Sequence, residues 1–200
     1  ILTGDSSPSE FEDTVNELKK HILEGEIFQA SPVRTIITDC NAEPLDIYKA
    51  LRSLSPSPHM FFINHKNGIL LGSSPEIFLR VQGMQDKTLE LHPASSMRPR
   101  GTMNNVLDPD IDARYEAELK TDERIIGGHI MLLDLARNDM ARLSKPATRV
   151  TTQSFSVEKH SVFQYLVSTV KGTLRSDLDA LHAFTAFMNA GTVTGVPKRA

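Results

Sequence analysis

The sequence predicts an α+β fold built on antiparallel β-sheets with packed helices. Two hairpin-like segments follow one another over residues 59–91, and long helical patterns follow between residues 112 and 143. Hairpins in series followed by helices are typical of α+β folds, whereas a parallel sheet needs strands and helices in alternation. The sequence contains no glycine-rich phosphate loop of either common type. The chain therefore lacks the pattern of a βαβ array.

The first predicted element is a helix that begins at a capping box. Ser9 and Glu12 have the spacing of such a box, and Gly25 stands where the helix is expected to end. Apolar residues recur between them at helical spacing, namely Phe11, Val15, Leu18 and Ile22.

A strand and a short helix are predicted next. Residues 27–37 are rich in β-branched side chains, and Pro32 in their middle indicates an edge strand or a bulge. Pro44 suits the first turn of a helix, which is expected to stop near Ser53.

Hairpins are predicted between His59 and Leu91. The apolar runs MFFIN and ILLGS flank HKNG, in which Asn67 and Gly68 suit a tight turn. The stretch His59–Arg80 is therefore expected to hold two or three strands, and Val81–Leu91 is expected to form a further hairpin that turns through QGMQDK.

Two helices are predicted in the middle of the chain, one from about Asp112 to Lys120 and one from about Asp122 to Leu143. Gly127 and Gly128 are poor helix formers, each about 1 kcal/mol less favourable than alanine. Local interactions must offset them, or the second helix breaks there.

The stretch HIMLLDLARNDMARLSK (129–145) carries charges among its apolar residues. Asp134 with Arg137, and Asp139 with Arg142, are spaced to pair along one helix face. After it, residues 162–170 are predicted to form a strand and Ser176 to cap a last helix.

The composition excludes several classes of function. Two hundred residues, 40% hydrophobic and 24% charged, suffice for one large or two small domains. A net charge of -3 gives no electrostatic indication of binding to nucleic acid or to an anionic membrane. The apolar runs are short for a membrane span, and the N-terminus does not resemble a signal peptide. The single cysteine, Cys40, excludes an internal disulfide and fits a cytoplasmic location.

Seven ordered stretches closely resemble the chorismate-using domain of anthranilate synthase component I. They are GEIFQASPVR (25–34), SPSPHMFF (55–62), GSSPEIFLR (72–80), RPRG (98–101), HIMLLDLARNDMARL (129–143), LVSTVKGTLRSDLDALHAF (166–184) and GTVTGVPK (191–198). The resemblance implies the chorismate-utilising fold, incomplete at both ends. Residues 1–200 are then expected to be a single partial chorismate-binding domain, without the family's N-terminal regulatory part and C-terminal strands.

The resemblance also implies a lyase reaction of tryptophan biosynthesis, an aromatic amino acid pathway. Ammonia adds to chorismate, the hydroxyl group leaves, and elimination of pyruvate gives anthranilate. Magnesium binds the ring carboxylate, while acidic residues and a histidine handle protons. A glutamine amidotransferase subunit is the implied partner and source of ammonia.

The residues at two positions distinguish the branches of the family. At the position of Gln29, isochorismate and salicylate synthases both have a lysine that acts as general base. A glutamine there argues against the addition of water to chorismate. Ser95 stands where aminodeoxychorismate synthases have a nucleophilic lysine. By elimination, the anthranilate branch is the most similar.

Several positions that the resemblance makes functional carry other residues. Ser95, Ser96 and Met97 replace an Ala-Gly-Thr stretch that lines the chorismate pocket. Ile125 and Gly128 occupy the positions of two glutamates that serve the metal and acid/base chemistry. Because magnesium prefers oxygen ligands, the expected magnesium shell is not intact in this chain.

Tyr165 occupies the position of the family's catalytic histidine. With an ordinary phenol pKa near 10 it is a poor base, so it either donates a proton or fills the volume of the imidazole. His160, five residues earlier, is predicted to point to the opposite face of the strand. His129 is interpreted as structural, since no partner with metal-ligand spacing accompanies it.

The candidate substrate-binding residues are Gln29, Ser96, Met97, Thr192, Gly195 and Lys198. The small residues of GTVTG let backbone amides approach a carboxylate. Lys198 is expected either to attract a dianionic substrate or to be merely solvated.

Three hypotheses follow from these observations. The first is an anthranilate synthase component I-like protein with a weakened chorismate pocket, and the second is a pseudoenzyme that binds a chorismate-like ligand or an amidotransferase partner. The third is a member of the family with different chemistry, in which Ser95, Ser96 and Tyr165 form a new polar set.

Overall fold

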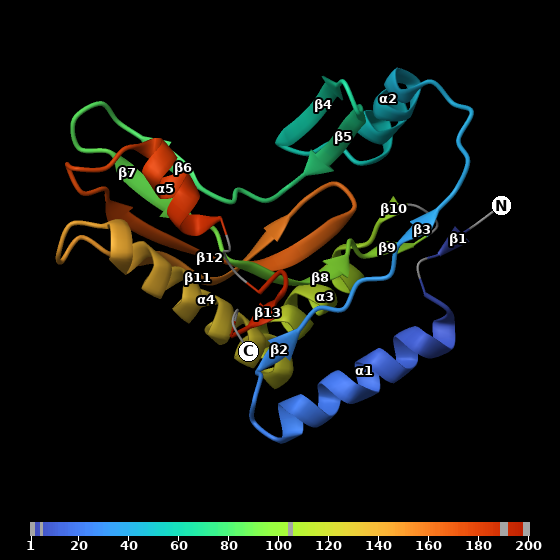
Figure 1. Ribbon diagram of the computed structural model, residues 1–200, viewed down its shortest axis with the longest axis horizontal. Coiled ribbons are helices and arrows are strands. Elements are labelled where there is room, and N and C mark those ends of the chain that lie inside the picture. Colours follow the sequence, from blue (N-terminus) through green and yellow to red (C-terminus); the bar gives the residue numbers. More distant parts are fainter. Residues whose placement is uncertain (1–2, 5, 104–105, 189–191, 198–200) are drawn as a thin grey trace. The chain divides into compact units, whose positions relative to one another are not determined.

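The computed structural model describes residues 3–4, 6–103, 106–188 and 192–197. The chain divides into two compact units, one of Ile1–Ala42 with Asn189–Ala200 and the other of Glu43–Met188. The α+β prediction is confirmed, because both units combine helices with antiparallel strand pairs (Figure 1). No helix in the described ranges is both long enough and apolar enough to cross a membrane.

Helix α1 (Pro8–Leu23) of the first unit begins with a capping box at Ser7 and Glu10. The Ser7 hydroxyl accepts a hydrogen bond from the Glu10 amide (3.2 Å), and the Glu10 carboxylate accepts one from the Ser7 amide (2.7 Å). The prediction of Ser9 and Glu12 was therefore wrong by two residues. The proline after the cap explains the shift, since its missing N–H and fixed φ suit the first helical position.

The strands of the first unit are short and form two antiparallel pairs. They are β1 (Thr3–Gly4) with β3 (Ile36–Ile37), and β2 (Gln29–Ala30) with β13 (Gly195–Val196). The predicted strand over 27–37 is thus two separate strands. Pro32 lies between them, and its lack of a backbone N–H explains the interruption.

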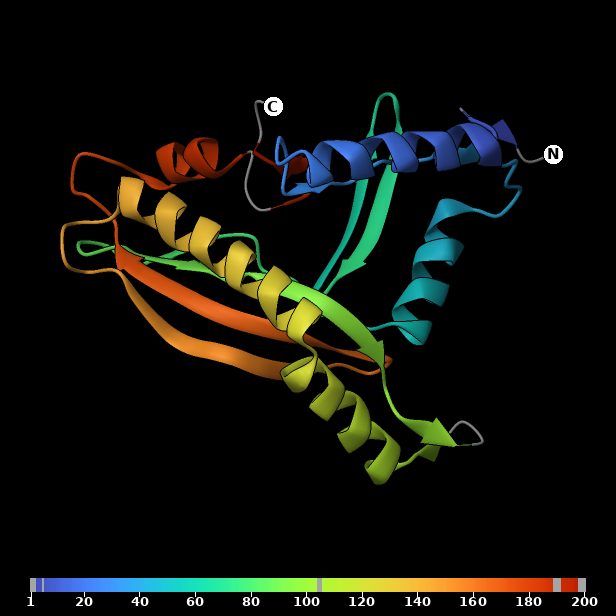
Figure 2. The ribbon, with the colours of Figure 1, turned by 90° about the horizontal axis from the view of Figure 1, so that it is seen from below.

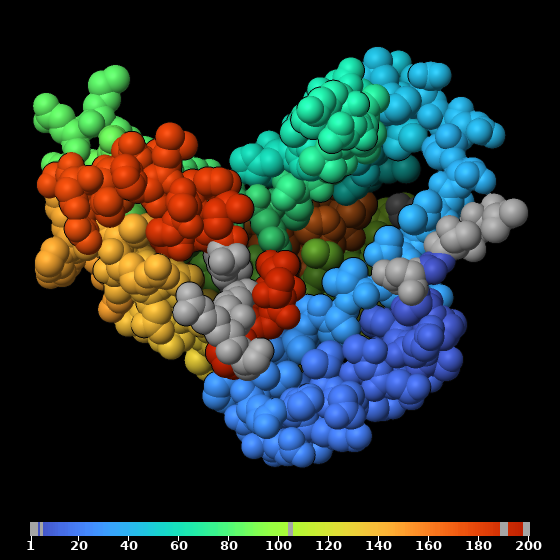
Figure 3. Space-filling view, viewed as in Figure 1, coloured from blue at the N-terminus to red at the C-terminus, as the bar shows by residue number. Residues whose placement is uncertain are grey.

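The second unit begins with helix α2 (Pro44–Leu54) and the hairpin of β4 (His59–His65) and β5 (Gly68–Ser74). Tyr48 of the helix meets Phe62 of the hairpin edge to face, with ring centroids 5.7 Å apart. The predicted hairpin is confirmed. In Figure 3 this lobe (teal) stands apart from the segment around helix α5 (red).

A five-stranded antiparallel sheet is the centre of the second unit. Its strands are β6 (Arg80–Gln82), β7 (Thr88–Leu91), β8 (Ala94–Pro99), β11 (Val150–Lys159) and β12 (Phe163–Thr173). The order is β11-β12-β7-β6, and β8 pairs with the first half of β12. A separate short pair, β9 (Thr102–Met103) with β10 (Val106–Leu107), follows β8.

The helices of the second unit are α3 (Pro109–Thr121), α4 (Glu123–Leu143) and α5 (Ala180–Phe187). Figure 2 shows α3 and α4 along one face of the sheet. Asp122 caps α4, and Asp179, not the predicted Ser176, caps α5. Both aspartates accept two backbone N–H bonds, as N-cap carboxylates commonly do.

Helix α4 continues unbroken through Gly127 and Gly128. Its inner face packs on β8 and β12, where Met140 and Leu143 are buried against the sheet. This burial offsets the two glycines, since tertiary packing supplies most of the stability of a helix. Of the two predicted ion pairs, Asp139 lies 3.6 Å from Arg142, while Asp134 accepts a hydrogen bond from the amide of Asn138.

We predict that Gly127→Ala and Gly128→Ala each raise the free energy of unfolding by about 1 kcal/mol. A Cβ at either position has no described non-local atom within 4 Å, so only helix propensity changes. Denaturant unfolding measures the effect. Gly101→Ala is the control and should destabilise the fold, because its Cβ would collide with the Asp112 backbone. Destabilisation by Gly128→Ala would contradict this account.

Candidate functional site

The buried Asp112 carboxylate is the centre of a network beside the sheet. Arg100 donates to both of its oxygens (Nε to Oδ1, 2.8 Å; Nη2 to Oδ2, 3.0 Å), and Lys159 lies 3.0 Å from Oδ2. The Gly101 amide donates to Oδ1 (3.0 Å). Chiefly the hydrogen bonds from Arg100 hold the pKa of this carboxyl well below its usual range.

The same arginine holds the tip of the β11–β12 hairpin. Its Nη1 donates to the carbonyl oxygen of His160 (2.7 Å). Its backbone amide donates to the carbonyl oxygen of Val162 (3.0 Å). The His160 amide donates to the Phe163 carbonyl (2.8 Å) and closes the turn. The position of the His160 backbone therefore depends on the Asp112 network.

The His160 side chain lies against Tyr165, so the prediction that it points to the opposite face was wrong. Its ring stacks on the Tyr165 ring with centroids 5.2 Å apart and planes 11° apart, and Nε2 lies 3.2 Å from the phenol oxygen. His160 lies in the turn just after β11 ends, where the two-residue alternation of a strand does not apply.

Tyr165 is 4% exposed, and its hydroxyl donates to Glu158 Oε2 at 2.8 Å. Burial, with the Glu158 carboxylate second, raises the pKa of the phenol. The phenol is thus a stable hydrogen-bond donor and not a base at neutral pH.

Met97 is the direct cross-strand partner of Tyr165, because β8 pairs with β12 at this position. The next pair is Ser95 with Leu166, so Ser96 is an extra residue in a β-bulge. Ser96 has φ +44°, a left-handed conformation that favours glycine. Ser96 and Met97 are both exposed, and Met97 keeps 53% of its surface.

His129 is fully buried and bonded on both sides. Its Nδ1 lies 2.7 Å from the Ser95 hydroxyl and its Nε2 lies 2.8 Å from the Ser168 hydroxyl. Burial lowers the pKa of the imidazole, which favours the neutral form. These contacts agree with a structural role that fastens α4 to β8 and β12.

The first turns of α4 do not fit a magnesium ion. Ile125 is half-buried and offers only hydrocarbon, and Gly128 is exposed and has no side chain. Among the described residues, the acidic and histidine groups close enough to share an ion are His21, Glu24 and Glu26 on the first unit. The network there is exposed and includes a His21–Glu26 contact of 2.6 Å, which is common without a metal.

Three predicted substrate-binding residues lie together in the first unit. Gln29 pairs with Val196 across β2 and β13, next to Gly195, and the Ser31 hydroxyl donates to the Thr192 carbonyl (3.3 Å). Gly195 has φ +148°, and a Cβ there would lie 2.7 Å from the Gln29 carbonyl oxygen. Lys198 lies outside the described residues.

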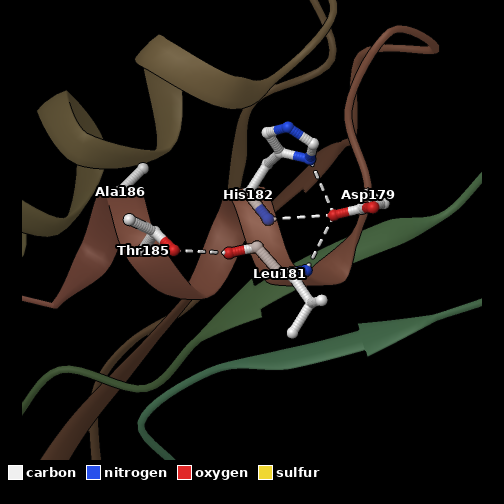
Figure 4. A pocket seen from close by; sticks show the side chains of 5 residues that line it. All are labelled: Asp179, Leu181, His182, Thr185 and Ala186. Atoms are coloured by element: carbon white, nitrogen blue, oxygen red, sulfur yellow. Dashed lines mark hydrogen bonds and ion pairs between the residues drawn. The ribbon is translucent and has the colours of Figure 1, made fainter.

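A shallow hollow on α5 is lined by Asp179, Leu181, His182, Thr185 and Ala186 (Figure 4). The Asp179 carboxylate accepts bonds from the Leu181 and His182 amides and lies 2.7 Å from His182 Nδ1. Capping of the helix therefore accounts for the contacts of Asp179 and His182, and the Thr185 hydroxyl donates to the Leu181 carbonyl (2.9 Å).

Sequence reasoning missed Glu158 and Ser168 as partners of the candidate residues. Glu158 is the partner of Tyr165 across β11 and β12. Strand β11 was not predicted from the sequence, and only its register against β12 shows this pairing.

The geometry can be compared with known proteins. The sequence profile of the chorismate binding enzymes matches residues 2–200. The chain belongs to this family. Anthranilate synthase component 1 of Buchnera aphidicola subsp. Rhopalosiphum maidis is 43% identical over 198 residues, and that of Serratia marcescens is 42% identical over 198 residues. Each alignment covers 98% of this chain and 38% of the relative, so the chain spans under two-fifths of their length.

Two solved structures share the fold. Anthranilate synthase component I from Streptococcus pneumoniae TIGR4 superposes with a TM-score of 0.84 at 28% identity, over 99% of this chain and 42% of that one. The menaquinone-specific isochorismate synthase MenF from Escherichia coli gives 0.79 at 17% identity, over 98% of this chain and 44% of that one. The predicted chorismate-utilising fold is thus confirmed, and the protein is anthranilate synthase component I-like.

We predict that Ser96→Gly raises the free energy of unfolding by about 1 kcal/mol, because glycine relieves the left-handed strain. Thermal or denaturant unfolding checks this. The neighbouring control Ser95→Gly should lower stability by about 1 kcal/mol, since it removes the hydroxyl bonded to His129. Equal effects of the two substitutions would contradict the assigned bulge.

We predict that Asp112→Asn lowers the free energy of unfolding by about 3 kcal/mol, because it leaves the Arg100 charge without its partner. The folded-state pKa of Asp112 lies below its unfolded value, so its contribution is present above about pH 4 and is lost as pH falls further. The variant should therefore lose part of the acid sensitivity of unfolding.

Denaturant unfolding at pH 7 and pH 3 measures both effects. The control is Asp110→Asn, an exposed position on the same helix turn, which should change stability by less than about 0.5 kcal/mol. Equal losses for the two variants would disprove the role of the network.

Proposed function

We propose that the chain binds chorismate or a closely similar acid, as part of an anthranilate synthase component I-like protein of tryptophan or related aromatic biosynthesis. Family membership and relatives that bear this name support the proposal. Residues 1–200 then belong to one partial chorismate-binding domain, and the protein works in the cytoplasm.

One observation carries this proposal most directly. Met97 and Tyr165, which the resemblance assigns to substrate-binding and catalytic positions, are direct partners across β8 and β12. The bulge residue Ser96 beside them is exposed, and the exposed Met97 offers apolar surface to a ring. Two predicted site residues far apart in sequence are thus adjacent in the fold.

Gln29, Thr192, Gly195 and Lys198 are proposed as further substrate contacts. Gly195 suits this role because a glycine lets another group approach the backbone closely. A glutamine amidotransferase subunit remains the proposed source of ammonia.

The two candidate functions differ in whether the chain converts chorismate to a product. An active chain is a chorismate-aminating lyase of the anthranilate synthase type. An inactive chain is a pseudoenzyme that binds the acid alone, and Ile125 and Gly128 in place of metal-binding glutamates favour it. In either case we propose that binding by this chain does not require magnesium at α4.

We predict that chorismate binds with the same dissociation constant, within about twofold, in EDTA and in excess magnesium, because Ile125 and Gly128 of α4 offer no carboxylate. Isothermal titration calorimetry measures both constants. The double variant Ile125→Glu/Gly128→Glu is the matched comparison and should gain magnesium dependence, since the surroundings of Gly128 leave room for a side chain.

Binding by the unchanged chain only in magnesium would contradict this proposal, and absence of binding in both conditions would disprove chorismate as the ligand. Anthranilate fluorescence, measured with chorismate and ammonia, then separates the lyase from the pseudoenzyme.

A further inference from the structure

The protons of the Glu158, Tyr165 and His160 chain can be assigned from its geometry. A phenol has one proton, and Tyr165 donates it to the Glu158 carboxylate, which only accepts (2.8 Å). The phenol oxygen must then accept in its other contact, 3.2 Å from His160 Nε2. In the neutral imidazole the proton of His160 is therefore on Nε2, and Nδ1 bears a lone pair.

The lone pair on Nδ1 is accessible. Within the described residues, Nδ1 has no hydrogen-bond partner, and it is not among the buried side-chain atoms that lack one. The His160 side chain is 15% exposed, whereas the Tyr165 residue is 4% exposed. A ligand or solvent molecule can thus reach the imidazole more readily than the phenol.

The imidazole is also held in place. Its ring contacts both Phe163 and Tyr165, with centroids 5.3 and 5.2 Å away and planes 25° and 11° apart, and these two rings also contact each other at 6.0 Å. Arg100 binds its carbonyl oxygen. A base fixed in this way suffers little loss of orientation when it accepts a proton.

We propose that His160 Nδ1 is the general base of the chorismate site, in place of the imidazole absent from position 165. This inference rests on the proposed function. Nδ1 accepts a proton from an N–H or O–H group of the bound reactant, whose bonding electron pair stays on that nitrogen or oxygen. The Nε2 proton passes to the Tyr165 oxygen, and the phenol proton passes to Glu158, so the imidazole and the phenol end neutral.

Tyr165 and Glu158 are positioning residues in this scheme, since they act through the imidazole. The charged groups around the chain are the Glu158 carboxylate, 3.9 Å from Nε2, the Glu76 carboxylate, which acts on Tyr165, and the Arg100 guanidinium at the carbonyl.

Nitrogen-15 NMR of the histidine side chains tests the tautomer without any ligand. His160→Gln identifies the signals. We expect the Nε2–H tautomer for His160 in the unchanged chain and a mixture of tautomers in Tyr165→Phe, which removes the acceptor. An Nδ1–H tautomer in the unchanged chain would overturn the proposal, whatever the ligand.

The second test is formation of anthranilate from chorismate and ammonia as a function of pH. His160→Gln should lower kcat about a hundredfold or more. It should also abolish the rise of kcat with pH that comes from an unprotonated base. His65→Gln, at the exposed tip of the β4–β5 hairpin, is the control and should leave kcat unchanged. Glu158→Gln should keep the tautomer, because its amide oxygen still accepts, yet lower kcat.

A His160→Gln variant with the activity of the control would overturn the role of the base, as would chorismate binding without turnover. Absence of chorismate binding would instead disprove the proposed function, and the base assignment with it. The ligand-free tautomer distinguishes these failures.

Discussion

The ion pair between Arg100 and the buried Asp112 is the interaction on which the second unit depends. A buried carboxylate must be paired, and Asp112 is paired by an arginine, a lysine and a backbone amide. The arginine also binds the His160 carbonyl, and the lysine belongs to β11. One carboxylate on α3 thereby fixes the end of β8 and the β11–β12 turn. The glycine of the RPRG stretch is required because Asp112 lies directly against it.

The positions that the resemblance assigns to metal and proton chemistry carry other residues, while the fold is that of the family. The α4 helix runs unbroken, and its buried histidine is bonded to serines on two strands. In contrast, Ile125 and Gly128 offer no side-chain oxygen atoms. Position 165 carries a phenol whose proton is bound by Glu158, and an imidazole from the adjacent turn stacks against it. Glu158, Tyr165 and His160 therefore form a hydrogen-bonded and stacked group within the fold of the family.

The sequence predicts this fold where local signals are strong, as in the helical periodicity of α4 and the tight turn between β4 and β5. It does not predict β11, because this strand has two register shifts against β12 and Phe155 has φ +55°. Such bulges remove the alternation on which strand prediction relies. The substrate positions are predictions from resemblance, and the pairing of Met97 with Tyr165 can be seen only from the strand register. The side of His160 was mistaken because a turn residue was treated as part of a strand.

The most direct test of chorismate binding at the β8 bulge is an NMR titration of the chain labelled with ¹³C-methyl methionine. Met97 lies at the bulge and is 53% exposed, whereas Met84 lies between β6 and β7 and is 96% exposed. Met97→Leu and Met84→Leu identify the two signals. The account predicts a saturable shift of the Met97 methyl signal with chorismate and none for Met84. A Met97 signal that stays unchanged at saturating chorismate would contradict it.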